Sequence, residues 1–586
     1  MENIRDRIPP AIIVMGEPIH HTTLLERMAA LHVPGVSVAV IHDGRLEWAR
    51  GFGVTQVGGP AVDDKTLFQA ASISKPVTAL AVLQLVQSGI LNLDTDVNTY
   101  LKSWKIPDSE LTASHKVTVR ELLSHTAGVT VDGFGGYSST DPLPTILQTL
   151  DGLPPANNLP IRVDQIPGSQ WRYAGGGYVI LRLLLEELTG QSFDHLMQEK
   201  VLGPIGMAHS RFEQPLSPEH LAHAAIPANE DGKALKLGPR IYPELAPDGL
   251  WTTASDLARY AIEVQRSLAG QPGSLLSAPT ARLMLTPALN HWGLGPIVGD
   301  DERHPYFTHS GGNVGFVSIL VAYNQGDGAV ILTNGSGFGA YSLAIDLIRS
   351  IAQEYKWPDF KPVHHRTVRL SPDLLDQNAG VYQTSPDACI VVTREASKLS
   401  VHATGERKIL LLPLAKNRFV EAEATPQTFL PRADETYVSF KAGADGSASE
   451  IDLFMNGVTP TVSGKRLSAV EAAPVEKRMA MLEKRFEAQQ PAPESERALR
   501  RLLNELVAGK PDYDRMTPEI AKAVSSVVTL DQQLLSALGP VGSMSFRRVA
   551  PDGVDTFHIV FQNGEADFEI SVNEEGKIQH ALYFPD

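Results

Sequence analysis

The segment from Val77 to Gln87 constrains the fold of this chain more than any other, because its residues are apolar on nearly every side of a helix. A helix with that pattern has no face for water and must lie inside a large core. Gly89 follows it and marks a helix end. A second apolar segment, Val179–Leu188, ends before Gly190 and is predicted to be another helix. The sequence therefore predicts a sizeable globular unit with a buried helix.

Strand patterns flank these two helices on both sides in the sequence. Val36–Ile41 is rich in β-branched residues, and Asp43-Gly44 offers a two-residue hairpin turn into Leu46–Ala49. Gly315–Tyr323 and Ala329–Thr333 form a second predicted strand pair. Because the two pairs enclose one mixed region, we expect the first and last strands of that region to share a sheet.

Several domains are expected, since 586 residues exceed the size of one ordinary core. Two prolines and no periodicity between Lys356 and Pro362 predict a boundary. Beyond it, short strand-like runs alternate with turn residues, and the last segment combines helix and strand patterns. We therefore predict a multidomain chain with an α/β (α+β) unit of helices around a central antiparallel sheet at 1–356, a small β-barrel at 368–467, a helical linker at 474–494 and a small α+β domain at 495–586.

Charge and composition argue against several classes of function. The chain has 51 Lys plus Arg against 67 Asp plus Glu, a net charge of −16, so a phosphate-coated partner such as nucleic acid would be repelled. No apolar run reaches the roughly 18 residues of a membrane span, and the first residues lack the apolar stretch of a signal peptide. The one cysteine, Cys389, excludes an intramolecular disulfide, and its strand-like surroundings predict a core position.

The pattern Ser72-Ile73-Ser74-Lys75, at the start of the first predicted helix, is the strongest candidate for chemistry. A spacing of three residues puts Ser72 and Lys75 on one helix face, where the amine can reach the hydroxyl. The helix start also supplies free N–H groups, which stabilise negative charge on a carbonyl oxygen. Alone, the pattern is weak, because a lysine beside a buried helix start is more often a surface residue whose amine reaches water.

Two further segments strengthen that candidate. Tyr173 precedes Gly175–Gly177 and is predicted to lie on a glycine-rich turn ahead of the second helix. His309 begins the run Ser310-Gly311-Gly312-Asn313, just ahead of the late strand pair, where a strand edge can border a site. There the Gly312 N–H could hold an oxyanion together with the Ser72 N–H, and His309 could share a proton. Taken singly, a tyrosine near a glycine loop and a histidine before a strand are more often structural.

Together these segments resemble the superfamily of serine β-lactamases and penicillin-binding proteins, in the branch of class C β-lactamases, D-aminopeptidases and family VIII esterases. The resemblance covers about residues 20–355. It is carried by Phe68–Lys75 as the nucleophile motif, Leu122–Gly128 as the hallmark loop and Gly249–Leu257 as the start of a shared helix. The region 368–467 looks like the lipocalin-like barrel of several such hydrolases, and 495–586 resembles an NTF2-like domain in outline.

The resemblance implies that Ser72 is the acylated nucleophile, Lys75 its proton-relay partner and Tyr173 the second member of a general-base pair. For this role, the pKa of Lys75 or of Tyr173 must be lowered towards neutrality. Gly175 stands where the family often has the Asn of Tyr-x-Asn, and His309 stands where β-lactamases have the Lys of Lys-Thr-Gly. Both departures are expected to weaken recognition of acylamino side chains and of carboxylate-bearing β-lactams.

We therefore predict a serine hydrolase that acts through an acyl-enzyme on small carboxylic esters. A D-amino-acid peptidase or amidase, or a D,D-carboxypeptidase with weak β-lactamase activity, is the alternative within this class. A catalytically silent peptidoglycan-binding or scaffold protein is the alternative outside it. The predicted site has the catalytic residues Ser72, Lys75, Tyr173 and His309, the oxyanion-hole N–H groups of Ser72 and Gly312, and the substrate-binding residues Gly175, Gly311 and Asn313.

The expected partner is a small ester or amide substrate. The sequence implies no metal or other cofactor, no nucleic acid and no membrane span, and it leaves a homodimer open. The resemblance implies a periplasmic or secreted location, with a cytoplasmic one as the alternative.

Overall fold

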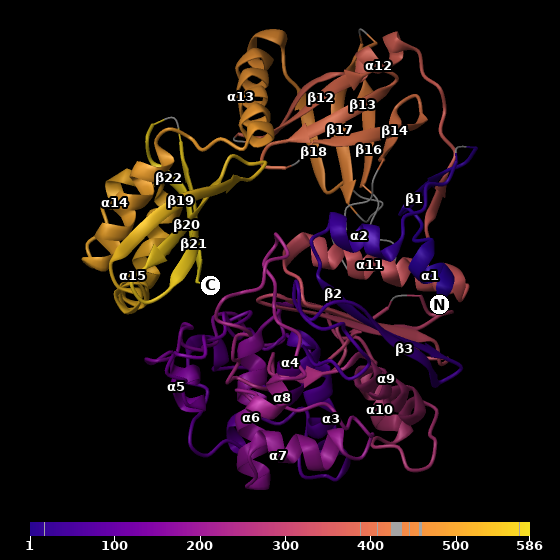
Figure 1. Ribbon diagram of the computed structural model, residues 1–586, viewed down its shortest axis with the longest axis vertical. Coiled ribbons are helices and arrows are strands. Elements are labelled where there is room, and N and C mark those ends of the chain that lie inside the picture. The colour runs from indigo at the N-terminus through magenta and orange to yellow at the C-terminus, as the bar shows by residue number, and fades with distance from the viewer. Residues whose placement is uncertain are drawn as a thin grey trace. The chain divides into compact units, whose positions relative to one another are not determined.

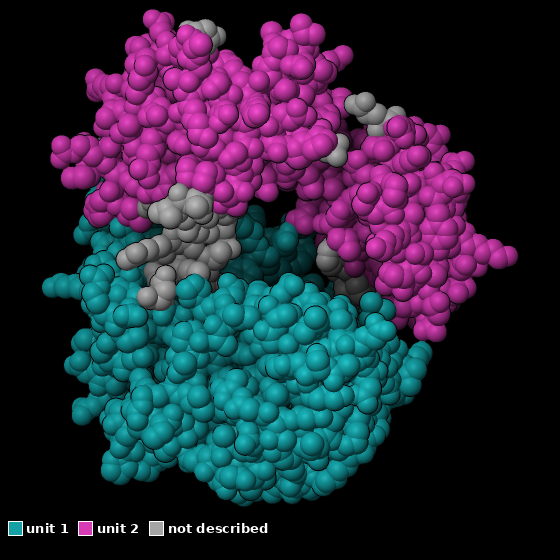
Figure 2. Space-filling model, turned by 180° about the vertical axis from the view of Figure 1, so that it is seen from behind, with its two compact units in different colours: residues 1–11, 19–362, 426–432 teal, residues 12–18, 363–425, 433–586 magenta. Residues whose placement is uncertain are grey.

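The structure, a computed structural model, describes the chain apart from residues 17, 300, 387, 407, 423–435, 445, 456–459, 574 and 586. It divides into two compact units, which Figure 2 colours teal and magenta. The first contains Met1–Ala11 and Ile19–Pro362, and the second contains Ile12–Pro18, Val363–Thr425 and Ala433–Asp586. Each unit has hydrophobic clusters of its own.

A six-stranded antiparallel sheet forms the centre of the first unit (Figure 1). Its first two strands form the predicted hairpin, whose turn residues Asp43 and Gly44 both have positive φ, as the tight turn requires. β2 also pairs with β9, which confirms that the first and last strands share a sheet. In spatial order the strands are β3 (Arg45–Gly53), β2 (Gly35–His42), β9 (Gly328–Thr333), β8 (Phe316–Tyr323), β7 (Tyr306–Asn313) and β6 (Ile297–Val298).

Helices cover both faces of this sheet, so its middle strands are buried on both sides. Side chains of β2 point alternately to the two faces of the sheet. Val36, Val38 and Val40 belong to the hydrophobic cluster on one face, and Ala39 and Ile41 belong to the cluster on the other. The first cluster includes helices α1 (Glu2–Asp6), α2 (Leu24–Ala30) and α11 (Gly337–Glu354). The opposite side holds α3 (Ser74–Gln87), α4 (Val119–Leu123), α5 (Ile146–Asp151), α6 (Gly175–Thr189), α7 (Phe193–Met197), α8 (Pro218–Leu221), α9 (Ala254–Leu268) and α10 (Ala278–Met284).

Helix α3 is the buried helix that the sequence predicts. Every residue from Ser74 to Leu83 is buried, Lys75 included. The burial of a lysine in this position decides between the two interpretations of the Ser-x-x-Lys pattern, because a surface lysine would reach water.

The first unit ends at Pro362, within the predicted boundary segment, but that segment is not free of the core. Trp357 is only 1% exposed, and its ring lies 5.3 Å from that of Tyr323 in β8. Trp357 therefore belongs to the core of the first unit, although it lies within the predicted boundary segment. A single aromatic residue in an aperiodic segment has no pattern from which its burial could be predicted.

The second unit contains a closed barrel of eight antiparallel strands in sequence order, which confirms the predicted small β-barrel. Tyr382, Phe419 and Phe440 belong to its core, and Cys389 is buried in β12, as predicted. The part of the prediction that covers 423–435 lies outside the described residues. The strands are β11 (Gly380–Ser385), β12 (Ala388–Glu395), β13 (Lys398–Ala403), β14 (Ile409–Ala415), β15 (Arg418–Glu421), β16 (Thr436–Ala442), β17 (Ala448–Met455) and β18 (Val462–Arg466).

The barrel is followed by a long helix and a four-stranded module (Figure 1). α13 (Ala469–Ala488) starts ahead of residue 474, because Ser468 and Glu471 form a capping box. Arg485 of α13 pairs with the buried carboxylate of Asp555 at 2.7 Å. The module consists of α14 (Ser495–Val507), α15 (Pro518–Leu538), β19 (Val541–Val549), β20 (Asp555–Phe561), β21 (Glu565–Val572) and β22 (Ile578–Pro585), an α+β arrangement as predicted.

Among the smaller elements, α12 (Pro372–Asn378) precedes the barrel, and β1 (Ile12–Val14) pairs in parallel with β10 (Val363–His365). Within the described ranges, none of the helices combines the length and apolarity needed to cross a bilayer. The described His, Cys, Asp and Glu residues form no group of three or more that could hold a metal ion.

We predict that Trp357→Ala lowers the free energy of unfolding of the first unit by about 3–5 kcal/mol, because it removes a large buried ring and leaves a cavity. Urea unfolding followed by far-UV circular dichroism measures the effect. The matched control is Val57→Ala, since Val57 is 72% exposed and its truncation should change stability by less than about 0.5 kcal/mol. Equal, small effects of both substitutions would show that Trp357 contributes nothing to the core.

Candidate active site

Ser72 lies in a short 3₁₀ turn, Ala71–Ile73, which leads directly into α3. The α-helix itself begins only at Ser74, so the expectation that Ser72 opens the helix is corrected by two residues. Ala71, just before the serine, has φ of 48°, a left-handed conformation that costs energy for any residue with a side chain. The backbone at Ser72 is therefore held in a strained turn by its surroundings.

Two serine hydroxyls fix this turn from opposite sides. Ser74 Oγ donates to the Ala71 carbonyl at 2.6 Å and accepts from the Leu250 N–H at 3.0 Å. Ser318 of β8 donates to the Ala70 carbonyl at 2.7 Å. The turn is thus tied both to the central sheet and to the segment around Leu250.

A short strand pair brings residues near position 250 beside Ser72. β4 (Phe68–Gln69) pairs antiparallel with β5 (Trp251–Thr252). After β5, the Thr253 side chain caps α9, so Gly249–Leu257 does lead into a helix, as the family resemblance implies. The residue just before that segment, Asp248, consequently reaches the predicted nucleophile.

Lys75 is completely buried, and its ammonium group contacts three acceptors. Lys75 Nζ lies 2.9 Å from Ser72 Oγ, 3.0 Å from the Pro247 carbonyl and 3.2 Å from Asp248 Oδ1. The structure therefore brings Ser72 and Lys75 together, as the spacing predicts, and adds a carboxylate to the pair.

Asp248 is the residue that the sequence analysis missed. It is 4% exposed, and its Oδ1 accepts a hydrogen bond from Ser72 Oγ at 3.0 Å. Because 176 positions separate the two residues, no local spacing connects them. The only available signal was its place directly before the Gly249–Leu257 segment.

Tyr173 packs over the Lys75 ammonium, whose nitrogen lies 4.9 Å from the centre of the ring. The Tyr173 ring also lies tilted against the His125 ring, with 4.4 Å between the centroids. The N–H of Ala174, the next residue, donates to His125 Nδ1 at 3.1 Å. His125, which belongs to the Leu122–Gly128 loop, was not assigned a role from sequence. It fixes the ring and backbone around Tyr173.

The three glycines after Tyr173 do not form the predicted turn, because α6 already begins at Gly175. At Gly176 the lack of a side chain has a steric reason, because a Cβ there would meet the Thr130 carbonyl at 2.5 Å. Gly175 donates its N–H to the Asp132 carbonyl at 2.9 Å and is not among the residues that line the pocket described below. Its predicted contact with substrate therefore has no support from the geometry.

His309 lies ahead of the predicted strand pair, β8 and β9, as expected, and it belongs to a further strand, β7, that the sequence did not predict. Its Nδ1 contacts the Ser310 carbonyl at 2.5 Å and must carry the hydrogen, because a carbonyl oxygen only accepts. Burial and the nearby charge of Lys75 lower the pKa of His309 to about 3, so the ring is neutral. Nε2 is then a bare acceptor, and it has no hydrogen-bond partner among the described residues.

Trp292 encloses the polar rings of the site. Its ring lies 5.5 Å from Tyr173, 5.6 Å from His309 and 4.9 Å from His125. The side chain is 6% exposed. The position of Trp292 in the site could not be predicted from sequence, because it is an isolated tryptophan in a loop. In the structure it screens three rings of the site from water.

Gly311 allows β7 to touch the turn that carries Ser72. A Cβ at this position would lie 2.3 Å from the Ala70 carbonyl and 2.8 Å from the Ser72 nitrogen. Beyond Thr308, the outer edge of β7 has no further described strand partner, since β6 pairs only with Phe307 and Thr308. Gly312 therefore lies on a strand edge that borders the site, as predicted.

The side-chain amide of Asn313 forms hydrogen bonds within the protein. Its Nδ2 donates to Gln69 Oε1 at 2.8 Å and to the Asp248 carbonyl at 3.2 Å. Both amide hydrogens are therefore used within the protein. The substrate-binding role of Asn313 remains a prediction, whereas its tie to Asp248 is part of the structure.

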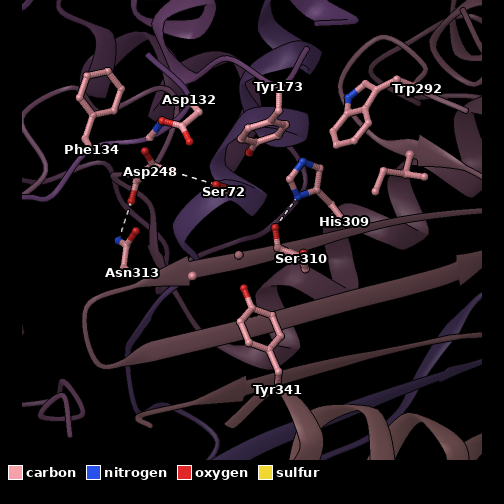
Figure 3. Close-up of a pocket in the computed structure, with 14 residues that line it drawn as sticks. Ser72, Asp132, Phe134, Tyr173, Asp248, Trp292, His309, Ser310, Asn313 and Tyr341 are labelled. Atoms are coloured by element: carbon pink, nitrogen blue, oxygen red, sulfur yellow. Dashed lines mark hydrogen bonds between the residues drawn. The ribbon is translucent and has the colours of Figure 1, made fainter. Parts of the chain in front are cut away.

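A pocket of about 320 Å³ joins these groups (Figure 3). Asp248, Tyr173 and His309 surround Ser72 in this view, and Tyr341 of α11 lies across β7 from them. None of the described lining residues is Lys or Arg, while two are aspartates, so the lining favours neutral or cationic ligands. The lining consists of Ser72, Asp132, Gly133, Phe134, Tyr173, Asp248, Trp292, Ile297, His309, Ser310, Gly311, Gly312, Asn313 and Tyr341.

The expectation that Lys75 or Tyr173 has a lowered pKa is wrong for this structure. Burial alone would lower the pKa of Lys75, but the charge of Asp248 and the contacts with Tyr173 outweigh it and raise that pKa. Burial also raises the pKa of the Tyr173 phenol, although Lys75 opposes the shift. At neutral pH, Lys75 is therefore an ammonium and Tyr173 a neutral phenol.

Glu244, close to the site in sequence, is a buried carboxyl group whose titration is measurable. It is 1% exposed, neither carboxyl oxygen has a hydrogen-bond partner among the described residues, and burial raises its pKa to about 8. In the unfolded chain it titrates near its ordinary value, about 4. Between these values the unfolded chain releases a proton that the folded protein keeps, so stability falls as pH rises and levels off above pH 8.

We predict that Glu244→Gln removes this contribution. Between pH 5 and pH 7 the wild type should lose on the order of 2–3 kcal/mol more unfolding free energy than the variant. Urea unfolding at several pH values measures the difference. Parallel pH dependences of the two proteins would show that Glu244 is ionised in the folded state.

Comparison with known proteins agrees with the predicted resemblance. The sequence profile of the family described as Beta-lactamase matches residues 22–353. "Penicillin-binding protein 4" of Amycolatopsis lactamdurans is 30% identical over 362 residues, 58% of this chain and 91% of that protein. "Penicillin-binding protein 4*" of Bacillus subtilis is 23% identical over 456 residues, 74% of this chain and 97% of that protein.

Among solved structures, the octameric penicillin-binding protein homologue from Pyrococcus abyssi aligns with a TM-score of 0.49 and 23% identity, over 75% of this chain and 98% of that one. The family profile alone spans more than half of the 586 residues, and the Amycolatopsis protein is covered almost entirely. The chain therefore belongs to the β-lactamase family, within the superfamily of β-lactamase-like and transpeptidase-like serine hydrolases.

Proposed function

We propose that this protein hydrolyses small carboxylic esters through an acyl-enzyme on Ser72. The observation that carries the proposal is the contact of Ser72 Oγ with a buried ammonium and a buried carboxylate, Lys75 and Asp248, at one wall of an open pocket. A serine hydroxyl in bulk water is a weak nucleophile and needs such partners for activation.

In the proposed reaction, Ser72 Oγ attacks the ester carbonyl carbon, and negative charge moves to the carbonyl oxygen. The N–H groups of Ser72 and Gly312 stabilise that oxyanion, and the Lys75 ammonium adds positive charge beside it. The alcohol leaves with a proton, and water then attacks the acyl-enzyme and releases the acid. In this proposal the neutral phenol of Tyr173 donates a hydrogen bond to the oxygen that leaves.

The charge of the pocket supports neutral substrates. Among its described lining residues, Asp132 and Asp248 are acidic, His309 is neutral and no Lys or Arg occurs. Asp248 is paired with Lys75, but Asp132 is exposed at the pocket, and a β-lactam carboxylate or the terminal carboxylate of a D,D-peptide would meet it without a lining cation. Two relatives are called penicillin-binding proteins, but this lining disfavours the carboxylate that penicillins carry.

Asp132 favours a second candidate, a peptidase or amidase for substrates with a free amino-terminal D-residue. Its side chain is exposed at the pocket, and its only hydrogen bond given by the structure is with the adjacent Gly133 N–H. A protonated substrate amine would be attracted to this carboxylate. The silent scaffold alternative requires that Ser72 never becomes acylated.

We predict that Ser72→Ala reduces hydrolysis of p-nitrophenyl butyrate by roughly three orders of magnitude or more, because no nucleophile remains. Steady-state release of p-nitrophenol measures the rate. The matched control is Ser88→Ala, which removes an exposed hydroxyl at the end of the same helix and should leave the rate unchanged. Full activity of the Ser72 variant would refute the proposal.

A substrate panel separates the candidates. We expect p-nitrophenyl butyrate to be cleaved fastest, D-alanyl p-nitroanilide more slowly and a chromogenic cephalosporin slowest. A reversed order of the first two would favour the peptidase. No turnover of any of the three, with no covalent product on the protein, would favour the silent scaffold.

We also predict that Gly311→Ala reduces kcat/KM for the ester roughly 10–100-fold, because the added methyl would push β7 away from the Ser72 turn. The control is Gly135→Ala, since a Cβ there has only one neighbour, 4.0 Å away. Wild-type kinetics in the Gly311 variant would contradict the tight contact between β7 and the nucleophile turn.

A further inference from the structure

We propose that Asp248, and not Lys75 or Tyr173, accepts the proton of the Ser72 hydroxyl during acylation. This inference rests on the proposed function, because it assigns one step of the same acyl transfer. It makes Asp248 a catalytic residue, since its Oδ1 touches Ser72 Oγ, the atom that forms the new bond.

The hydrogen atoms of the cluster can be assigned from its distances. Lys75 Nζ has three acceptors within 3.2 Å: Ser72 Oγ, the Pro247 carbonyl and Asp248 Oδ1. The Tyr173 hydroxyl is a further contact of Lys75, and an ammonium can only donate to these groups, because it has three N–H bonds and no lone pair. Lys75 in this state has no lone pair with which to take a proton from Ser72.

The hydroxyl hydrogen of Ser72 must therefore point elsewhere. Since Ser72 Oγ accepts from Lys75, its own O–H is free to donate, and Asp248 Oδ1 lies 3.0 Å away as a carboxylate acceptor. The hydrogen bond already runs along the path of proton transfer. A donor–acceptor distance of this size is suited to general-base catalysis.

The other titratable groups around Asp248 are poorer acceptors. Tyr173 keeps its proton because burial raises its pKa, and His309 is a very weak base with a pKa of about 3. Asp132 lines the same pocket but has no hydrogen bond to Ser72. The groups that face Asp248 are Lys75 of α3, Tyr173 ahead of α6, His309 of β7, Asp132 at the pocket, and Tyr242 and Glu244 of its own loop.

The backbone around Asp248 is held in place. Asn313 Nδ2 donates to the Asp248 carbonyl at 3.2 Å and to Gln69 Oε1 at 2.8 Å, while Gln69 Nε2 donates to the Arg240 carbonyl at 2.7 Å. This chain of bonds connects β7, β4 just ahead of the Ser72 turn, and the loop of Asp248. A base fixed in this way needs no rearrangement before proton transfer.

The proposed step balances in atoms and charge. The Ser72 O–H bond breaks and its proton moves to Asp248 Oδ1, while Oγ forms a bond to the carbonyl carbon and the oxygen becomes an oxyanion. When the oxyanion collapses, the ester C–O bond breaks and the leaving alkoxide takes the proton from Asp248. In deacylation, water gives its proton to Asp248, and Ser72 Oγ recovers that proton as the acid leaves.

The test is Asp248→Asn in the full chain, with kcat/KM for p-nitrophenyl butyrate measured between about pH 4 and pH 10. The amide keeps the shape and can still accept hydrogen bonds, but it cannot take a proton. We expect kcat/KM at pH 7 to fall roughly 10²–10⁴-fold. We also expect the remaining activity to rise towards alkaline pH, because loss of the counter-charge lowers the pKa of Lys75 and frees its amine.

Two results would overturn the inference. One is a variant with wild-type kcat/KM and the wild-type pH profile. The other is a loss by the same factor at every pH, with the acid limb unchanged, which a merely structural role would produce. The matched control is Asp43→Asn, the same change at an exposed aspartate in the β2–β3 turn, whose profile should match that of the wild type.

Far-UV circular dichroism checks that the variant folds. The pH profile of the wild type is a second measurement, which does not depend on the variant. An acid limb below about pH 6 indicates a carboxylate base. A limb at higher pH that persists in Glu244→Gln indicates an amine or phenol and contradicts the inference. The Ser72→Ala protein separates the two proposals. If it is inactive while Asp248→Asn is fully active, only the role of Asp248 fails; if it is active, the acyl-enzyme itself fails.

Discussion

The buried ion pair between Lys75 and Asp248 is the interaction on which the rest of the site depends. Lys75 is completely buried in α3, and an isolated ammonium in that position would be costly enough to lose its proton. Asp248, 3.2 Å away, supplies the counter-charge, and the Pro247 carbonyl supplies a further acceptor. The nearby carboxylate of Asp248 raises the pKa of Lys75 and so keeps the amine protonated, and both side chains contact Ser72 Oγ.

The fold brings this cluster together from distant parts of the chain. The β4–β5 pair places the loop of Asp248 beside the Ser72 turn, and β7 closes the arrangement from the central sheet. Gly311 permits that closure because no side chain separates β7 from the turn. Aromatic rings then exclude water from the rear of the site, with Trp292 and His125 packed around Tyr173. The central sheet, buried on both faces, keeps these elements rigid.

Sequence patterns predicted those features that depend on local spacing. Ser72 and Lys75 are three positions apart on one helix start, so their contact followed from helical geometry, and the hairpin at Asp43-Gly44 followed from turn chemistry. Asp248 could not be predicted in the same way, because its contact with Ser72 depends on tertiary pairing across 176 positions. The direction of the Lys75 pKa shift depended on that unseen carboxylate, which is why the expectation of a lowered pKa was wrong.

The most direct measurement of the central claim is the position of the covalent adduct. The full chain is incubated with a fluorophosphonate, which reacts only with activated serines, and the modified peptide is found by mass spectrometry. The account predicts about one adduct per chain, on Ser72. An adduct on another serine, or esterase activity that persists with Ser72 unmodified, would contradict it.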